Sequence, residues 1–338
     1  MTQMSPRILI HGGIHKTGTT SLQIALSYSR DWYSGNGFVY PQTGKLGDAH
    51  HILARALKDP TQTGQAVLGD FLTEVEREQR LIVISSEEFC LFDPREVKAT
   101  VDFLKSHFRH ISVVFYLRPQ ALILRSQYSQ QLREGYIQCS FDEFFVEAAK
   151  HATFWNFRDL YELWTGAGAG LHENEVILRS ALRGDLYESD LVQDFFRNFL
   201  AYVNGDAVPS SQDENISLRV GQAYVIRKIL MESGVMSLPF EERRVLIETF
   251  ILNFPWDPVL LQEPLPISRD ILEYCRVRFK KDNAFLSSFF GNINSFDNWY
   301  RREISDVVTN KKRTEDCHAA LEESTERALT HWKSFFQI

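Results

Sequence analysis

Short apolar runs alternate with amphipathic stretches along the first part of the chain. The apolar runs are rich in β-branched residues and end at glycine, proline or polar positions, which is typical of strands buried in a parallel sheet. We predict strands at Arg7–His11, Gly37–Tyr40, Leu81–Ser85 and Ile111–Leu117, and one within Glu175–Leu182. The amphipathic stretches repeat apolar residues every three or four positions, which predicts helices. One predicted helix is capped by Asp48 and runs through Leu57. The other predicted helices are Thr19–Ser29, Phe71–Gln79, Pro94–Phe108, Ala121–Arg133, Phe141–Lys150, Phe154–Trp164 and Leu191–Tyr202.

This alternation of strands and helices predicts an α/β fold in which a central parallel sheet carries helices on both faces. The pattern changes after Asn204. Asn204–Asn215 is polar, and the chain beyond it contains helical patterns such as Leu218–Glu232 and Phe240–Leu252 with few strand signals. We therefore expect residues 1–204 to form the α/β core. Residues 205–338 are expected to form a mainly helical extension packed on it, as a second domain or as part of the same one.

The charge balance argues against nucleic acid as a partner. The chain has 37 basic and 44 acidic residues, and its formal net charge is -7. Basic residues are scattered apart from Lys280–Lys281 and Lys311–Arg313, whereas a nucleic-acid-binding protein usually concentrates them on one surface. A local positive cleft for a small anionic ligand remains compatible with this composition.

The cysteine pattern and the start of the chain favour a cytoplasmic protein. The cysteines are isolated and form no C-x-x-C pair, which argues against a zinc site or a disulfide framework and suits a reducing compartment. They are Cys90, Cys139, Cys275 and Cys317. Met1–Arg7 is short and polar and lacks the apolar segment of a signal peptide. No apolar run is long enough to span a bilayer, so we expect no integral membrane segment.

The segment Gly12–Ser21 (GGIHKTGTTS) follows the first predicted strand and opens the first predicted helix. A glycine-rich turn at this place can wrap an anion, because backbone N–H groups and the positive end of the helix point at the ligand. Gly13 and Gly18 match the glycines of the ordinary phosphate-binding loop, G-x-x-x-x-G-K-[ST]. Thr19 stands where that loop has its lysine, and Lys16 lies three residues earlier. A nucleoside-triphosphate loop altered in this way would make a poor ATPase.

The run K-T-G-T-T resembles instead the 5′-phosphosulfate loop of the sulfotransferases. The resemblance implies a three-layer fold like that of the P-loop NTPases. It also implies PAPS (3′-phosphoadenosine-5′-phosphosulfate) as the co-substrate and PAP as the product, with no metal. In that family the lysine contacts the phosphosulfate and supports the leaving group, which gives Lys16 a catalytic role. The loop residues expected to bind the donor are His15, Lys16, Thr17, Gly18, Thr19, Thr20 and Ser21.

Sulfotransferases carry a second element, an arginine at the end of a strand followed eight positions later by a serine on the next helix. Here Arg118 ends the strand Ile111–Leu117, and Ser126 stands eight positions on. The planar guanidinium of Arg118 suits a phosphate, and Ser126 lies two helical turns along and adds a hydroxyl. The resemblance implies that this pair holds the 3′-phosphate of PAPS.

Weaker similarities extend the resemblance over most of residues 7–220. Ile84–Phe89 contains an S-S-E segment similar to that of bacterial carbohydrate-type sulfotransferases. The run Phe157–Phe196 is similar to the late core of that family. Asn215–Leu218 resembles an N-x-S-L signature, with Ile216 where an acidic residue is expected. The C-terminal third carries no such similarity.

Sulfuryl transfer needs a base for the acceptor's proton, and the adjacent pair His50–His51 offers one because imidazole titrates near neutral pH. On a helix these neighbours point about 100° apart. His50 shares a face with Leu53 and Leu57, and this inward face favours His50 over His51 as the base. The alternative is that His50 is a structural histidine of the core.

Glu87 is the second candidate base, because it follows a central strand at the edge of the sheet where ligands bind. It could also orient Lys16 or the acceptor, or form only a salt bridge. Glu88 is the weaker neighbour, since alternation points it to the other face. Arg179, at the end of its predicted strand, could assist either ligand.

Two other functions remain open from the sequence. One is a phosphate-loop kinase that uses ATP and Mg²⁺, and the other is a catalytically silent nucleotide-binding protein on the same fold. The acceptor could be a glycan, a lipid or a small metabolite. The aromatic stretch Phe285–Tyr300 could line its cleft, although helix packing is the favoured explanation of that stretch. The sequence does not specify the oligomeric state.

Overall fold

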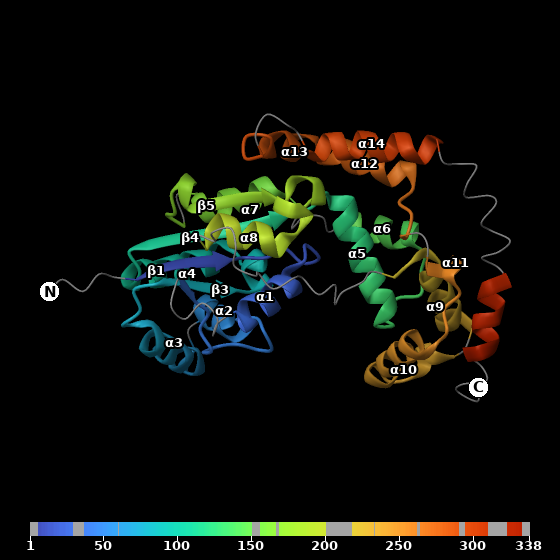
Figure 1. Cartoon of the computed structure of the whole chain (residues 1–338), viewed down its shortest axis with the longest axis horizontal. Coiled ribbons are helices and arrows are strands. Elements are labelled where there is room, and N and C mark those ends of the chain that lie inside the picture. Colours follow the sequence, from blue (N-terminus) through green and yellow to red (C-terminus); the bar gives the residue numbers. More distant parts are fainter. Residues whose placement is uncertain are drawn as a thin grey trace. The chain divides into compact units, whose positions relative to one another are not determined.

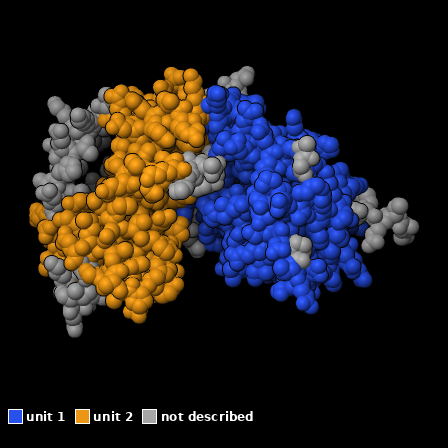
Figure 2. Space-filling model, turned by 180° about the vertical axis from the view of Figure 1, so that it is seen from behind, with its two compact units in different colours: residues 1–118, 153–215, 281–295 blue, residues 119–152, 216–280, 296–338 orange. Residues whose placement is uncertain are grey.

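The computed structural model describes residues 6–29, 37–59, 61–150, 156–166, 169–200, 218–232, 234–261, 264–290, 295–309 and 323–332. The chain divides into two compact units (Figure 2). Unit 1 comprises residues 1–118, 153–215 and 281–295, and unit 2 comprises residues 119–152, 216–280 and 296–338. This division differs from a boundary at residue 204, because the segment 119–152 packs with later helices and the segment 281–295 returns to the α/β unit.

Unit 1 is built on a five-stranded parallel sheet with the order β2-β3-β1-β4-β5 (Figure 1). The strands are β1 Arg7–His11, β2 Phe38–Val39, β3 Leu81–Ser85, β4 His110–Leu117 and β5 Val176–Ser180. β1 lies at the centre, with Ile8 paired to Ile82 on one side and to Ile111 on the other. All five predicted strands are therefore present, and the loop that follows β1 leaves the middle of the sheet.

Helices cover both faces of this sheet, which confirms the predicted three-layer α/β fold. On one face Leu9, Val83 and Val114 pack in a buried core with α1 (Thr19–Tyr28) and α8 (Leu191–Phe199). On the other face Phe115 contacts Trp164 of α7 (Phe157–Thr165), with ring centroids 5.9 Å apart. The same side carries α4 (Pro94–His107), beside which α2 (His51–Lys58) and α3 (Gln62–Val75) pack.

Two helices of unit 1 begin elsewhere than the sequence predicts. α2 starts at His51 with His50 as its N-cap, rather than at a capping Asp48, because Leu46 and Ala49 form an antiparallel bridge just before it. α3 spans Gln62–Val75 rather than Phe71–Gln79. The part of α3 before Phe71 contains two glycines, Gly64 and Gly69, whose low helix propensity weakens the helical pattern of the sequence.

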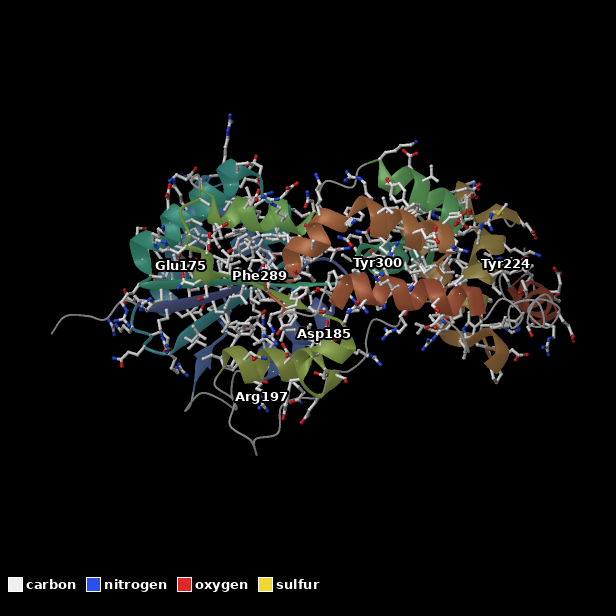
Figure 3. All side chains as sticks on the ribbon, turned by 90° about the horizontal axis from the view of Figure 1, so that it is seen from above. Glu175, Asp185, Arg197, Tyr224, Phe289 and Tyr300 are labelled. Carbon is white, nitrogen blue, oxygen red and sulfur yellow. The ribbon has the colours of Figure 1, made fainter. Side chains whose placement is uncertain are left out.

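Unit 2 is helical in its described part. Its helices are α5 (Gln120–Arg133), α6 (Phe141–Ala149), α9 (Val220–Glu232), α10 (Phe240–Asn253), α11 (Pro258–Leu261), α12 (Arg269–Arg278) and α14 (Ser295–Thr309). Helix α5 contacts α6, α9, α10 and α12 and so forms the centre of the unit. The buried Tyr300 of α14 (Figure 3) joins this centre, because its hydroxyl accepts from the Ala121 N–H at 3.2 Å.

The aromatic stretch Phe285–Tyr300 lies partly outside the described residues. Phe285 of α13 (Lys280–Leu286) and Phe289, which lies just after this helix, pack on Tyr161 of α7, with ring centroids 5.5 and 4.9 Å away. Helix packing thus accounts for these aromatic residues and for Tyr300. Over the part of the chain that the structure describes, no helix has the length and apolar character needed to cross a membrane.

Candidate functional site

The loop Gly12–Gly18 connects β1 to α1 and requires glycine at its start. The Gly12 N–H donates to the Val114 carbonyl at 2.9 Å, so the loop leaves the sheet in contact with β4. A Cβ atom on Gly12 would lie 2.3 Å from a ring carbon of Phe115, and one on Gly13 would lie 2.5 Å from Thr19 Cγ2. Any larger residue would therefore have to push the loop outward.

The loop turns at Lys16 and Gly18, which both have left-handed backbone angles, with φ of 70° and 95°. Such an angle is uncommon for a residue with a side chain, and it is found repeatedly at ligand-binding positions. Thr17, between them, fixes the turn from its buried side. Its N–H and its hydroxyl both donate to the Ile14 carbonyl, at 3.3 and 2.7 Å.

Helix α1 begins without a capping side chain. Gly18 is its N-cap and has no side chain to accept from the first turn, and that turn contains no acidic residue. The N–H groups of a first turn have no partner within their own helix and carry the positive end of its dipole. Thr20 and Ser21 are half-buried there, and His15 is exposed on the loop. The predicted loop residues are thus together on one turn.

Arg118 holds this turn from the neighbouring strand. It follows the last residue of β4, and its Nη1 donates to the Lys16 carbonyl at 2.9 Å. The guanidinium is half-buried. Arg118 and the loop Gly12–Gly18 are therefore in direct contact, and this contact fixes the backbone of Lys16, whose side chain carries a positive charge.

Ser126 belongs to α5 in unit 2, whereas Arg118 is the last residue of the first segment of unit 1. The pairing of these two residues on one phosphate stays a prediction. Ser126 is half-buried on its helix. Asn215–Ser217 of the N-x-S-L segment lie outside the described residues.

Glu87 lies beneath the start of α1 and connects several polar residues. It opens the short 3₁₀ helix Glu87–Leu91 after β3 and is 8% exposed. The Thr19 hydroxyl donates to its Oε1, and Gln23 Nε2 donates to its Oε2 at 3.1 Å. Burial raises the pKa of this carboxyl, but the hydrogen bonds from Thr19 and Gln23 outweigh burial, and the pKa lies below its ordinary value. Glu87 is therefore an anion at neutral pH.

His51 is the histidine that lies beside this carboxylate. Its Nε2 is 3.7 Å from Glu87 Oε2, and its Nδ1 is 2.8 Å from the Ser86 hydroxyl. The side chain is 25% exposed. A partly exposed imidazole therefore lies between a carboxylate and a hydroxyl group at the edge of this polar cluster.

His50 is buried and bonded to the backbone through both ring nitrogens. Nε2 lies 2.9 Å from the Pro41 carbonyl, and Nδ1 accepts from the Ser85 N–H at 3.2 Å. Its exposed fraction is 0%, and burial lowers its pKa to about 4. The ring joins the strand β3 to the segment before α2, which is what a structural histidine does.

Three buried residues of this polar cluster, His11, Gln23 and Ser85, were not expected at the site from the sequence. The hydroxyl of Ser85, which ends β3, lies 2.8 Å from Nδ1 of His11, which ends β1, and 3.2 Å from Gln23 Nε2. Burial lowers the pKa of His11 to about 4. His11 and Ser85 each end an apolar strand with a polar side chain, and this position is the feature of the sequence that could have indicated them as site residues.

Glu88 and Arg179 are each held by an ion pair. Arg55 Nη2 donates to Glu88 Oε1 at 2.7 Å. Arg179 binds both carboxylate oxygens of Asp194, each at 2.8 Å, and the Tyr116 hydroxyl donates to the same carboxylate. Asp194 is 1% exposed, so the Arg179 pair ties β5 to α8.

The described residues contain no group of three or more histidine, cysteine, aspartate or glutamate side chains placed to hold a metal ion. No protein-family model matches the chain, and no curated protein matches it. Among solved structures it is similar to the crystal structure of a sulfotransferase from Alicyclobacillus acidocaldarius. The match covers 84% of this chain and 95% of that one, with 14% sequence identity and a TM-score of 0.43.

Proposed function

We propose that this chain is a sulfotransferase that moves the sulfuryl group of PAPS to a hydroxyl or amine of a glycan, lipid or small-molecule acceptor and releases PAP. The observation that carries this proposal is the turn at Lys16. Its lysine stands three residues before the place of the ATPase lysine, has a left-handed backbone, and is held through its carbonyl by Arg118. This arrangement supports the motif K-T-G-T-T as a phosphosulfate loop.

The loop has the features that a phosphosulfate needs. Glycines at positions 12 and 13 leave no room for side chains, and the first turn of α1 offers N–H groups without a capping side chain or an acidic residue. Lys16 and the α1 N-terminus would hold the 5′-phosphosulfate, and Arg118 and Ser126 would hold the 3′-phosphate. When bound, PAPS supplies the activated sulfuryl group. Lys16 then stabilises charge on the leaving phosphate.

A kinase is the competing function, and the contact of Thr19 argues against it. In an ATP-binding loop this position carries the lysine that reaches the β- and γ-phosphates. Here Thr19 is buried, and its hydroxyl donates to Glu87. The Thr19 side chain therefore points into the protein, where its hydrogen bond to Glu87 stabilises the start of α1.

We assign the role of base to His51 rather than to His50. The His50 ring nitrogens are both bonded to backbone groups in the core. His51 would take the acceptor's proton at Nδ1, the nitrogen beside the Ser86 hydroxyl, while Glu87 stabilises the imidazolium from the side of Nε2. Glu87 itself is a weak base, because its hydrogen bonds lower its pKa, and we assign it a positioning role.

Calorimetry with PAP and ADP tests the nucleotide. We expect PAP to bind more tightly than ADP without Mg²⁺, and Arg118→Ala to abolish that preference. Arg77→Ala is the matched control, since the Arg77 side chain is 90% exposed in the same unit. Equal binding of both nucleotides, or a requirement for Mg²⁺, would support the kinase instead.

Transfer from labelled PAPS to a panel of glycans, lipids and metabolites tests the reaction. We expect one acceptor class to be labelled, and Lys16→Ala to abolish labelling. Lys98→Ala is the control, because Lys98 is an exposed lysine that pairs with Asp102 on α4. PAP binding without transfer to any acceptor would favour a silent nucleotide-binding protein.

A further inference from the structure

Unit 2 contains two arginines that contact one short segment of chain, Arg125 through its side chain and Arg219 through its backbone. Arg125 lies on α5, and its Nη1 donates to the Leu265 carbonyl at 3.4 Å. Arg219 precedes α9 and forms an antiparallel bridge with Pro264, the neighbour of Leu265. Both arginines are half-buried. The segment at Pro264–Leu265 thus brings together the residues that carry these two guanidinium groups.

A second contact fixes the same corner. The Leu218 N–H donates to the buried Ser129 hydroxyl at 2.7 Å. Ser129 lies four positions after Arg125 on α5, so the two share one face of the helix. Leu218 is the residue directly before Arg219. The face of α5 that carries Arg125 is therefore the face against which the start of α9 packs.

Neither guanidinium forms an ion pair with any residue that the structure describes in unit 2. The exposed arginines of the same unit behave differently: Arg269 pairs with Glu273, and Arg301 with Asp297. The pKa of Arg125 lies below its ordinary value, mainly because of burial. The negative charge of Glu303 raises this pKa, and the positive charge of Arg219 lowers it. Two half-buried like charges without a paired carboxylate are costly unless an anion neutralises them.

We propose that Arg125 and Arg219 form a binding site for an oxyanion group, a phosphate or sulfate ester. Guanidinium groups bind such groups through paired N–H donors, and two of them match a doubly charged anion. The site goes beyond the proposed function and does not depend on it, because inorganic sulfate is a sufficient probe. Because Arg118 and Ser126 are assigned to the donor's 3′-phosphate, we expect the ligand to be an acidic group of the acceptor, and the donor's phosphate is the alternative source that the experiment must exclude.

Titration calorimetry of the full chain with inorganic sulfate tests the site. We expect Arg125→Gln and Arg219→Gln each to weaken sulfate binding by about tenfold or more, because each removes charge-assisted hydrogen bonds. Arg269→Gln should leave it unchanged. Sulfate binding should persist in Lys16→Ala, which removes the cation of the phosphate loop. Loss of all sulfate binding in Lys16→Ala, or unchanged affinity in both arginine variants, would overturn the proposal.

Glu303 provides the counter-test, because it is the carboxylate whose charge acts on Arg125. If the arginines await an anion, Glu303→Gln should tighten sulfate binding by removing a repulsive charge. If the only role of Arg125 is to balance the charge of Glu303, then Glu303→Gln should leave sulfate binding unchanged. It should then lower the melting temperature as much as Arg125→Gln does. Arg219→Gln keeps the test valid if Arg125→Gln fails to fold.

Titration with PAP in the same variants separates the two sources. Parallel loss of PAP and sulfate binding in Arg125→Gln would identify the donor's phosphate as the ligand. Loss of sulfate binding with PAP binding intact would identify an acidic group of another ligand, such as the acceptor. A failure of PAP to bind the unmodified chain would refute the proposed function and leave the sulfate result standing.

Discussion

Acid should destabilise unit 1 through His50. The ring is buried, and its nitrogens bond the Pro41 carbonyl and the Ser85 N–H. Burial lowers its pKa from 6.5 to about 4 in the folded chain. Between these values the unfolded chain binds a proton that the folded chain refuses, so stability falls as the pH falls through 6.5 and stops falling below about 4.

The size of the effect follows from the same two values. At about 1.4 kcal/mol for each pH unit, the fall in the pKa of His50 corresponds to about 3 kcal/mol when the pH lies below both values. About 2 kcal/mol of this is already lost at pH 5. His11, whose pKa is lowered to about 4 in the same way, adds a similar loss. These losses are a large share of the roughly 5–15 kcal/mol by which domains are stable.

Denaturant unfolding at pH 7, 6 and 5 measures the effect. His50→Gln keeps an amide donor and acceptor but cannot titrate. We expect it to be less stable than the unmodified chain at pH 7 and to lose about 2 kcal/mol less between pH 7 and pH 5. His107→Gln, at an exposed histidine of α4, should leave the slope unchanged. An unchanged slope in His50→Gln would show that His50 titrates normally and is not held neutral by burial.

Three further changes test other parts of the structure. Burial raises the pKa of Asp282 from 3.8 to about 6, so its charge costs stability as the pH rises through these values; Asp282→Asn should raise the melting temperature at pH 8 and not at pH 4. Gly13→Ala should weaken PAP binding by about tenfold in calorimetry, because the added methyl would press on Thr19; unchanged affinity would mean that the loop moves freely. Tyr300→Phe leaves the buried Ala121 N–H without its hydroxyl and should cost about 1–3 kcal/mol in denaturant unfolding; no loss would show that another acceptor takes its place.

The strands and the glycine-rich turn between β1 and α1 could be predicted from the sequence because their signals are local. Each strand is a short apolar run that ends at a change of polarity, and all five appear in the sheet. The shift of the lysine to Lys16 is also visible in the sequence alone. The part of α3 before Phe71 could not be predicted, because its glycines weaken the helical pattern. In the folded chain the packing of α3 against α2 compensates for these glycines.

The choice between His50 and His51 could be made only from the tertiary structure. The sequence places both on one helix and favours His50 by its inward face. In the structure α2 starts at His51, and His50 is an N-cap residue with φ of -84° and ψ of 47°, so a helical face does not apply to it. Its inward direction is real, but it leads to backbone partners rather than to a ligand.

The environment of Glu87 likewise depends on contacts between residues far apart in the chain. Its hydrogen-bond donors Thr19 and Gln23 are 68 and 64 positions away. The sequence determined that a carboxylate ends a central strand near a phosphate loop. Only the packing of α1 over β3 decided that this carboxylate is ionised, satisfied and beside His51, because desolvation and hydrogen bonding, which set a pKa, are properties of the folded neighbourhood.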